Sequence, residues 1–124
     1  MQRPYIPVLI WSLVILGLSI MPGVDLPASW MDLLSLDKLA HAFVYGLLCY
    51  LSLRALRLTD QISRKNITWV IVLTGLYGIA LEWVQFAFFP GRFFERLDII
   101  ANIIGSLLGA LIFYYLQLRK PEAR

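Results

Sequence analysis

Four long apolar runs dominate the chain. They extend over about 5–21, 39–56, 67–89 and 97–118, and shorter polar segments separate them. At 1.5 Å per residue, each run is long enough, or nearly so, for a helix to cross the roughly 30 Å of bilayer hydrocarbon. A small soluble domain would instead repeat its apolar positions with a period of 3.6 or 2. The pattern predicts an all-α, polytopic membrane protein, a bundle of four transmembrane helices that forms one domain over residues 1–124.

Composition and charge agree with this class and argue against others. The chain is 60% hydrophobic and 15% charged, with a mean hydropathy of +0.74, which exceeds what a soluble core of this length needs. Its net charge of +3 reflects Lys and Arg at the ends of the apolar runs, where we expect them to bind lipid headgroups or fix the topology rather than bind nucleic acid. Cys49 has no second cysteine to pair with, which excludes intrachain disulfides and cysteine-based metal motifs. Membrane lipids are therefore expected partners, and nucleic acid is not.

The basic residues also predict the orientation. With the N-terminus in the cytoplasm, only Lys38, Arg92 and Arg96 lie outside. Eight basic residues then lie inside: Arg3, Arg54, Arg57, Arg64, Lys65, Arg119, Lys120 and Arg124. The positive-inside rule thus favours an N-in, C-in topology. Because no small-x-small cleavage motif follows the first run, we expect that run to be retained as the first span rather than removed as a signal peptide.

Local signals predict where some helices begin and end. Ser29–Asp32 resembles a capping box that opens a short amphipathic turn inside the segment 22–38. Asn66 is the expected N-cap of the third helix. Pro90, followed by glycine, is expected to end that helix.

Polar side chains recur at helical spacing near the predicted outer ends of the last three helices. They are Lys38, His41 and Tyr45 in the second helix, Glu82 and Gln85 in the third, and Asp98 and Asn102 in the fourth. An ionisable group at the centre of a membrane helix costs about 2.5–3.5 kcal/mol, so it normally faces a partner or a hydrated cavity. We therefore expect these stripes to converge on one polar pocket that opens to the extracytoplasmic side.

Arg92 follows the third helix in the predicted outer loop. From there it can fold back over the pocket and pair with Glu82 or Asp98, or contact an anionic ligand. The sequence leaves these partners open.

Several of these residues also have plainer interpretations. Lys38 can mark an interfacial helix start, Tyr45 can be a packing aromatic residue, and Asn102 can hold two helices together. Gly105 and Gly109 form a small-xxx-small motif, which predicts close helix packing. Such a motif packs between subunits as readily as within one, so a homo-oligomer is a further expectation.

Taken in order, these motifs resemble the VanZ-like family. They are D-K-x-x-H-x-x-x-Y from Asp37, E-x-x-Q from Glu82, P-G-R from Pro90, and D-x-x-x-N-x-x-G-x-x-x-G from Asp98. The resemblance covers roughly 37–110 and leaves the first helix as a generic span. It implies a small multi-pass protein of the bacterial cytoplasmic (inner) membrane, with a family namesake associated with resistance to the glycopeptide teicoplanin. The positions that it implies to be functional are Lys38, His41, Tyr45, Glu82, Gln85, Arg92, Asp98 and Asn102.

Two functions fit these positions best. In the first, the pocket binds or modifies a lipid-linked or amphiphilic envelope molecule, with Lys38 and Arg92 contacting an anionic head. In the second, the protein is an intramembrane hydrolase or transferase that uses Glu82, His41 and Asp98 as acid or base groups. A proton or transport path is less favoured, because the predicted cytoplasmic halves of the helices lack ionisable residues. One histidine with two carboxylates could hold a metal, but without defined ligand spacing we predict neither a metal nor a cofactor.

Overall fold

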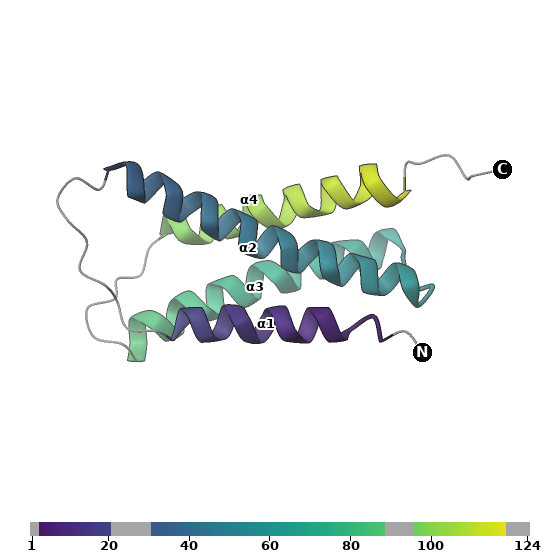
Figure 1. Ribbon diagram of the computed structural model, residues 1–124, viewed down its shortest axis with the longest axis horizontal. Helices are drawn as coiled ribbons and strands as arrows, with labels where there is room; N and C mark the ends of the chain where they lie inside the picture. Colours follow the sequence, from purple (N-terminus) through teal and green to yellow (C-terminus); the bar gives the residue numbers. More distant parts are fainter. Residues whose placement is uncertain (1–2, 21–30, 89–95, 119–124) are drawn as a thin grey trace.

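The structure is a computed structural model that describes residues 3–20, 31–88 and 96–118, with the side chains of the second helix described from Lys38 onward. These residues form only helices, so the predicted all-α class is confirmed. Successive helices run in opposite directions (Figure 1). Within the described residues they are α1 (Ile6–Ser19), α2 (Met31–Leu58), α3 (Arg64–Phe88) and α4 (Arg96–Phe113), followed by a π-helical turn, η1 (Tyr114–Leu118).

Three of the described helices are long and apolar enough to cross a membrane. These segments are Lys38–Leu58 of α2, Arg64–Phe88, and Arg96–Leu118, which joins α4 to η1. Helix α1 is also apolar but has 14 residues, a length of about 21 Å. The chain is therefore a multi-pass membrane protein.

Different helices begin and end at the two ends of the bundle. Helices α1 and α3 end where α2 and α4 begin, at the left in Figure 1. We call this the pocket end, because a polar cavity lies near it. At the opposite end, α1 and α3 begin and α2 and α4 finish.

Helix α2 begins earlier than the apolar pattern predicts. It is continuous from Met31, whereas the apolar run begins at Leu39. Met31 and Asp32 belong to this continuous helix, so the described half of the predicted short turn is not a separate element. The other residues of the predicted capping box, Ser29 and Trp30, lie outside the described residues.

Helix α3 has a different N-cap from the one predicted. The Ser63 hydroxyl oxygen accepts a hydrogen bond from the backbone N–H of Asn66 at 3.0 Å, which is the usual N-cap contact with the third helical residue. The Asn66 side chain instead donates to the Gln61 carbonyl at 2.6 Å. Asn66 therefore lies inside the first turn, and the hydroxyl that precedes the helix is its cap.

Helices α2 and α4 approach each other to backbone contact. A Cβ atom on Gly105 would overlap the backbone of Ala42, and one on Gly109 would overlap the backbone of Gly46. In the reverse direction, a Cβ on Gly46 would lie 2.8 Å from the Gly105 carbonyl oxygen. The small-xxx-small motif thus packs within this chain, and the contact holds the middle of α2 against the middle of α4.

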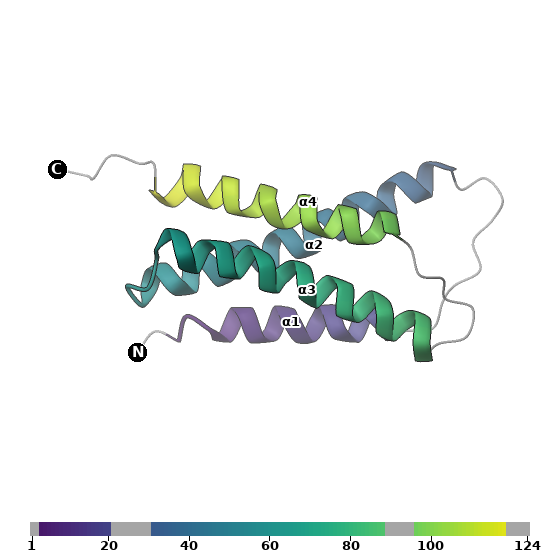
Figure 2. The ribbon, with the colours of Figure 1, turned by 180° about the vertical axis from the view of Figure 1, so that it is seen from behind.

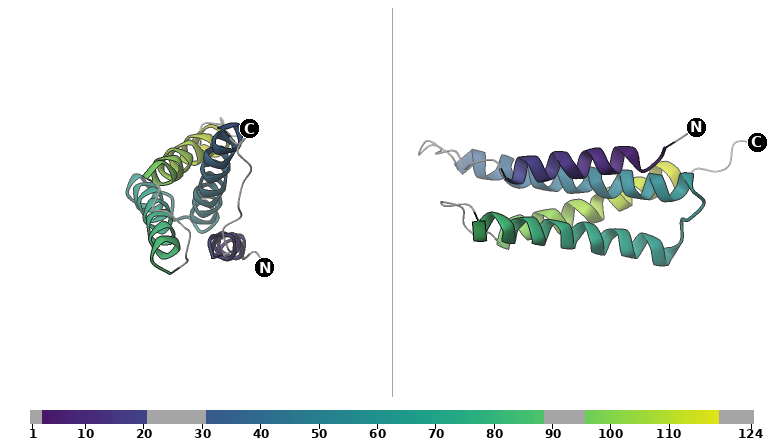
Figure 3. Two further views of the ribbon diagram at one scale, coloured as in Figure 1. Left: turned by 90° about the vertical axis from the view of Figure 1, so that its left-hand side faces the viewer. Right: turned by 90° about the horizontal axis from the view of Figure 1, so that it is seen from below.

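Helix α1 lies at the side of the bundle. Seen from behind, α3 passes between α4 and α1 in front of α2 (Figure 2). In the end-on view, α1 stands beside α2 and away from α4 (Figure 3), and among the described residues it contacts only α2 and α3. Ile15 of α1 joins Tyr45, Leu48 and Leu81 in a buried cluster that supports the pocket end.

Candidate functional site

A cavity of about 220 Å³ lies among the four helices near the pocket end. Its wall combines polar and apolar side chains. The polar lining residues are Ser19, His41, Tyr45, Glu82, Gln85 and Asn102, and the apolar ones are Ile15, Leu18, Ala40, Val44, Gly78 and Leu81. Three of the four helices contribute at least one polar side chain that the sequence had singled out. The polar stripes of α2, α3 and α4 therefore do converge at one depth of the bundle.

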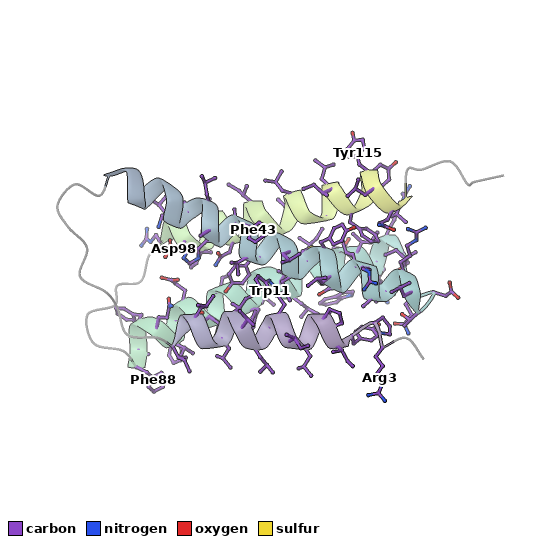
Figure 4. The ribbon with its side chains drawn as sticks, viewed as in Figure 1. Arg3, Trp11, Phe43, Phe88, Asp98 and Tyr115 are labelled. Carbon is purple, nitrogen blue, oxygen red and sulfur yellow. The ribbon has the colours of Figure 1, made fainter. Side chains whose placement is uncertain are left out.

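Three polar contacts join α2 to α4 beside this cavity. The Lys38 ammonium donates to the Asp98 carboxylate and forms an ion pair with it. His41 Nδ1 lies 3.0 Å from Asn102 Oδ1, and His41 Nε2 lies 3.7 Å from Asp98 Oδ2. His41 therefore lies between the Asn102 amide and the Asp98 carboxylate, with one ring nitrogen toward each. Figure 4 shows Asp98 at this end of the bundle, far from Arg3 and Tyr115.

The polar side chains of α3 and α4 are deeply buried at the cavity. Glu82 is 3% exposed, Asp98 7% and Asn102 1%. Burying such groups away from water is unfavourable unless they have polar partners, so the helices must pack in a way that supplies those partners. The result is a charged interior within an otherwise apolar set of helices.

Gly78 on α3 makes room for this arrangement. A Cβ atom at Gly78 would lie 2.7 Å from Asn102 Nδ2 and 3.2 Å from Tyr45 Cε1. With no side chain there, Asn102 and Tyr45 can approach the α3 backbone one turn before Glu82. The glycine therefore sets the spacing of the cavity wall.

Helix α1 is held against the cavity by two side chains of α3 that the sequence reasoning did not assign to it. Gln85 Nε2 donates to the Ser19 carbonyl at 2.9 Å, and Tyr77 Oη donates to the Ser12 carbonyl at 2.6 Å. The two serines are seven residues apart and so share a face of α1. Both acceptors are backbone carbonyls, so the residue types of α1 gave no signal for these contacts. Ile15, Leu18 and Ser19 line the cavity, so α1 is one of its walls rather than a generic span.

Trp11 makes the third polar contact of α1. Its indole Nε1 donates to the Val44 carbonyl of α2 at 2.9 Å. A tryptophan N–H that is partly buried in a membrane protein needs such an acceptor, since no water is available within the hydrocarbon. Trp11, labelled in Figure 4, therefore connects α1 to α2, and Gln85 and Tyr77 connect α1 to α3.

The predicted site residues divide into three groups. His41, Tyr45, Glu82, Gln85 and Asn102 line the cavity together. Lys38 and Asp98 form the ion pair beside it and are not among the lining residues. Arg92 lies outside the described residues, so its pairing with Glu82 or Asp98 stays a prediction.

The cavity offers an acidic group, an imidazole and several other hydrogen-bonding groups. Glu82 provides a carboxyl group, His41 an imidazole, and Gln85 and Asn102 amides, all within reach of apolar side chains. Such a wall can hold a polar head joined to a hydrocarbon portion, or place an acid and a base near one bound molecule. Within the described ranges, no group of three or more His, Cys, Asp or Glu side chains is placed to hold a metal ion.

A known family model matches nearly all of the described helices. The model of the family described as VanZ/LLP1 matches residues 6–117, from the start of α1 to the π-helical turn. No curated protein and no solved structure matches the chain. The match includes α1, which the motif resemblance had left out, as well as every described residue of the cavity. The chain therefore belongs to the VanZ/LLP1 family.

Proposed function

We propose that the protein binds the polar head of a lipid-linked or amphiphilic cell-envelope molecule in this cavity. The observation that carries the proposal is a wall in which buried Glu82 and Asn102 face the same space as the apolar Ile15 and Leu18 of α1. A purely structural polar cluster would fill its space with its own side chains. Here a volume of about 220 Å³ is left, and an amphiphile matches its mixed character.

The charge distribution supports placing this pocket on the extracytoplasmic side of the bacterial inner membrane. Lys38 and Arg96 lie at the pocket end of the described chain. The opposite end carries Arg3, Arg54, Arg57, Arg64 and Lys65. By the positive-inside rule, the richer end faces the cytoplasm. Helix α1 then serves as a fourth span in an N-in, C-in topology, antiparallel to α2.

The lining residues favour a head with hydrogen-bond donors. The carboxyl group of Glu82 is part of the cavity wall, and carboxyl oxygens can accept more than one hydrogen bond. Hydroxyl, amide or amine groups of a ligand would donate to Glu82, and an acceptor group would face His41. Sugars and peptides attached to envelope lipids carry all of these groups.

A direct test uses the lipid-linked peptidoglycan precursor as the probe. Native mass spectrometry of the detergent-solubilised protein should detect the bound precursor, and Leu18→Trp should remove it by filling the cavity. Leu13→Trp is the matched control, because Leu13 is similarly exposed on α1 but does not line the cavity. Equal binding by the two variants would contradict a ligand in this cavity.

The family's namesake suggests a cellular test. We propose that the pocket supports resistance to teicoplanin, because glycopeptides act outside the membrane on cell-wall precursors. Expression in a susceptible bacterium should raise the inhibitory concentration of teicoplanin, and Glu82→Gln should abolish the rise at equal protein level in the membrane. An unchanged inhibitory concentration with the wild-type protein would contradict the link to resistance without bearing on precursor binding.

A second candidate function is an intramembrane hydrolase or transferase. The observation in its favour is the placement of His41 between the Asn102 amide and the Asp98 carboxylate, with Glu82 across the same cavity. That arrangement fixes the orientation of an imidazole next to a second acid or base group. Incubation of the purified protein with the same precursor, followed by mass spectrometry, should reveal a product that His41→Gln does not form. Binding without any product would leave the first function in place and refute the second.

A further inference from the structure

An apolar groove of about 460 Å³ runs along α2 and α4 on a different face from the polar cavity. Different faces of α2 line the two sites. Ala40, His41, Val44 and Tyr45 line the cavity, whereas Leu39, Ala42, Phe43, Gly46, Leu47 and Tyr50 line the groove. The side chains that form the groove walls include Phe43, Leu47, Tyr50, Leu108, Ile112 and Leu116.

The groove exists because its floor has no side chains. Gly46, Gly105 and Gly109 all line it, and they are the residues through which α2 and α4 touch. Large apolar residues stand on both sides of this glycine floor. A furrow of this shape accommodates one hydrocarbon chain, which fills it without separating the helices.

At the end away from the polar cavity, the groove runs into a chain of polar contacts. Tyr50 Oη accepts a hydrogen bond from Gln117 Nε2 at 3.2 Å, and Gln117 Oε1 accepts one from the Arg57 guanidinium. Gln117 follows Leu116 in the π-helical turn η1. The groove therefore changes from hydrocarbon-like to cationic within a short distance.

Arg54 belongs to the same face of α2. The positions Phe43, Leu47, Tyr50, Arg54 and Arg57 are separated by alternating steps of four and three residues, so they form one stripe along the helix. Both arginines are exposed at the end of α2. The stripe thus presents an apolar wall that continues into two cations.

We propose that this groove binds one anionic phospholipid, with an acyl chain along the glycine floor and the phosphate on Arg57 and Arg54. Guanidinium groups match phosphate geometry through paired hydrogen bonds, and basic sites beside membrane helices attract anionic headgroups. The charge at the end of the groove selects this occupant over a second copy of the chain, because the copy would bring the same two cations together.

The test measures phospholipid retention by the detergent-solubilised full-length protein in native mass spectrometry. The probes are phosphatidylglycerol and phosphatidylcholine with identical acyl chains. Phosphatidylglycerol should be retained preferentially, with about a fivefold loss of affinity for Arg54→Gln or Arg57→Gln and about twenty-five-fold for the double variant. Arg64→Gln, which removes a charge at the same end of the bundle from α3, should have little effect.

A second pair of variants tests the groove itself. Leu108→Trp should fill the groove and weaken phosphatidylglycerol retention, while Leu73→Trp, at a similarly exposed position of α3 outside the groove, should not. Equal retention of the two lipids, or a double arginine variant that behaves like Arg64→Gln, would overturn the proposal. Unchanged phosphatidylglycerol retention in Leu108→Trp would also overturn it. A dimer that Leu108→Trp dissociates would show instead that a second copy of the chain occupies the groove. Circular dichroism of each variant identifies any that has lost its fold. In that case Leu108→Phe replaces Leu108→Trp, and Arg57→Met, which also removes the charge, replaces Arg57→Gln.

Discussion

Replacing Gly105 with alanine tests the close contact between α2 and α4, on which the candidate site depends. The new Cβ atom would overlap the carbonyl oxygen, Cα and carbonyl carbon of Ala42, all of which are backbone atoms. No side-chain rotation can relieve that overlap. The two helices would have to move apart by roughly 1 Å to restore van der Waals separation.

A shift of this size affects the polar contacts as well as the packing. The distance of 3.0 Å between His41 Nδ1 and Asn102 Oδ1 would grow beyond the hydrogen-bonding range. Overpacking of a well-packed contact costs about 1–3 kcal/mol, and a polar contact between membrane helices contributes about 0.6 kcal/mol. The better helix propensity of alanine offsets about 0.5–1 kcal/mol of this. We expect Gly105→Ala to lower the free energy of unfolding by about 1–3 kcal/mol.

The free energy of unfolding can be measured by reversible SDS titration in mixed micelles, with helix content followed by circular dichroism. Gly75→Ala is the matched control, since its Cβ would meet only Ile103 Cγ1, at an ordinary contact distance of 3.8 Å. That variant should be stabilised by about 0.5–1 kcal/mol, through helix propensity alone. If Gly105→Ala proves as stable as Gly75→Ala, the backbone contact between α2 and α4 is refuted.

Three further predictions follow from the buried contacts. Lys38→Met should lower the free energy of unfolding by up to about 3 kcal/mol, because it removes the cation that pairs with the Asp98 carboxylate. In the same SDS titration, Lys38→Met combined with Asp98→Leu should recover most of this loss. A double variant no more stable than Lys38→Met would contradict the ion pair. Tyr77→Phe removes the hydroxyl that donates to the α1 backbone, so it should lower the free energy of unfolding by about 0.6 kcal/mol. It should also speed the hydrogen exchange of α1 amides and leave the exchange of α4 amides unchanged. The same increase in exchange rate in both helices would contradict a specific attachment of α1. Cys49 is fully buried, so a maleimide should label it only after unfolding, and rapid labelling of the folded protein would show that the packing around it is wrong.

Local sequence patterns determined the helices and the faces on which polar residues gather. Apolar runs must form helices in a bilayer because every backbone N–H and C=O needs a partner within its own segment. Helical spacing then puts His41 and Tyr45 on one side of α2, and Glu82 and Gln85 on one side of α3. The ordered motifs also indicated the family, which the match over residues 6–117 confirms. All of these properties depend on neighbours within one or two helical turns.

Local patterns were less reliable where several residues could play the same part. Ser63 and Asn66 are both good N-caps by residue type, and only the backbone path between α2 and α3 decides that Ser63 caps the helix. Likewise, α2 is already helical at Met31, eight residues before its apolar run begins at Leu39. Hydropathy records where a helix enters hydrocarbon, and the backbone hydrogen bonds record where the helix begins.

Only the tertiary structure decided which side chains meet. Helical periodicity gives the face of each helix but neither its rotation against its neighbours nor the point at which two helices cross. The pairing of Lys38 with Asp98 and the attachment of α1 through Gln85 both depend on those two quantities. So does the continuity of the apolar groove with Arg57, which joins residues of α2 to residues beyond α4. The sequence by itself determined that polar groups had to be sheltered inside the bundle, and the crossing of α2 and α4 at their glycines determined the partners that shelter them.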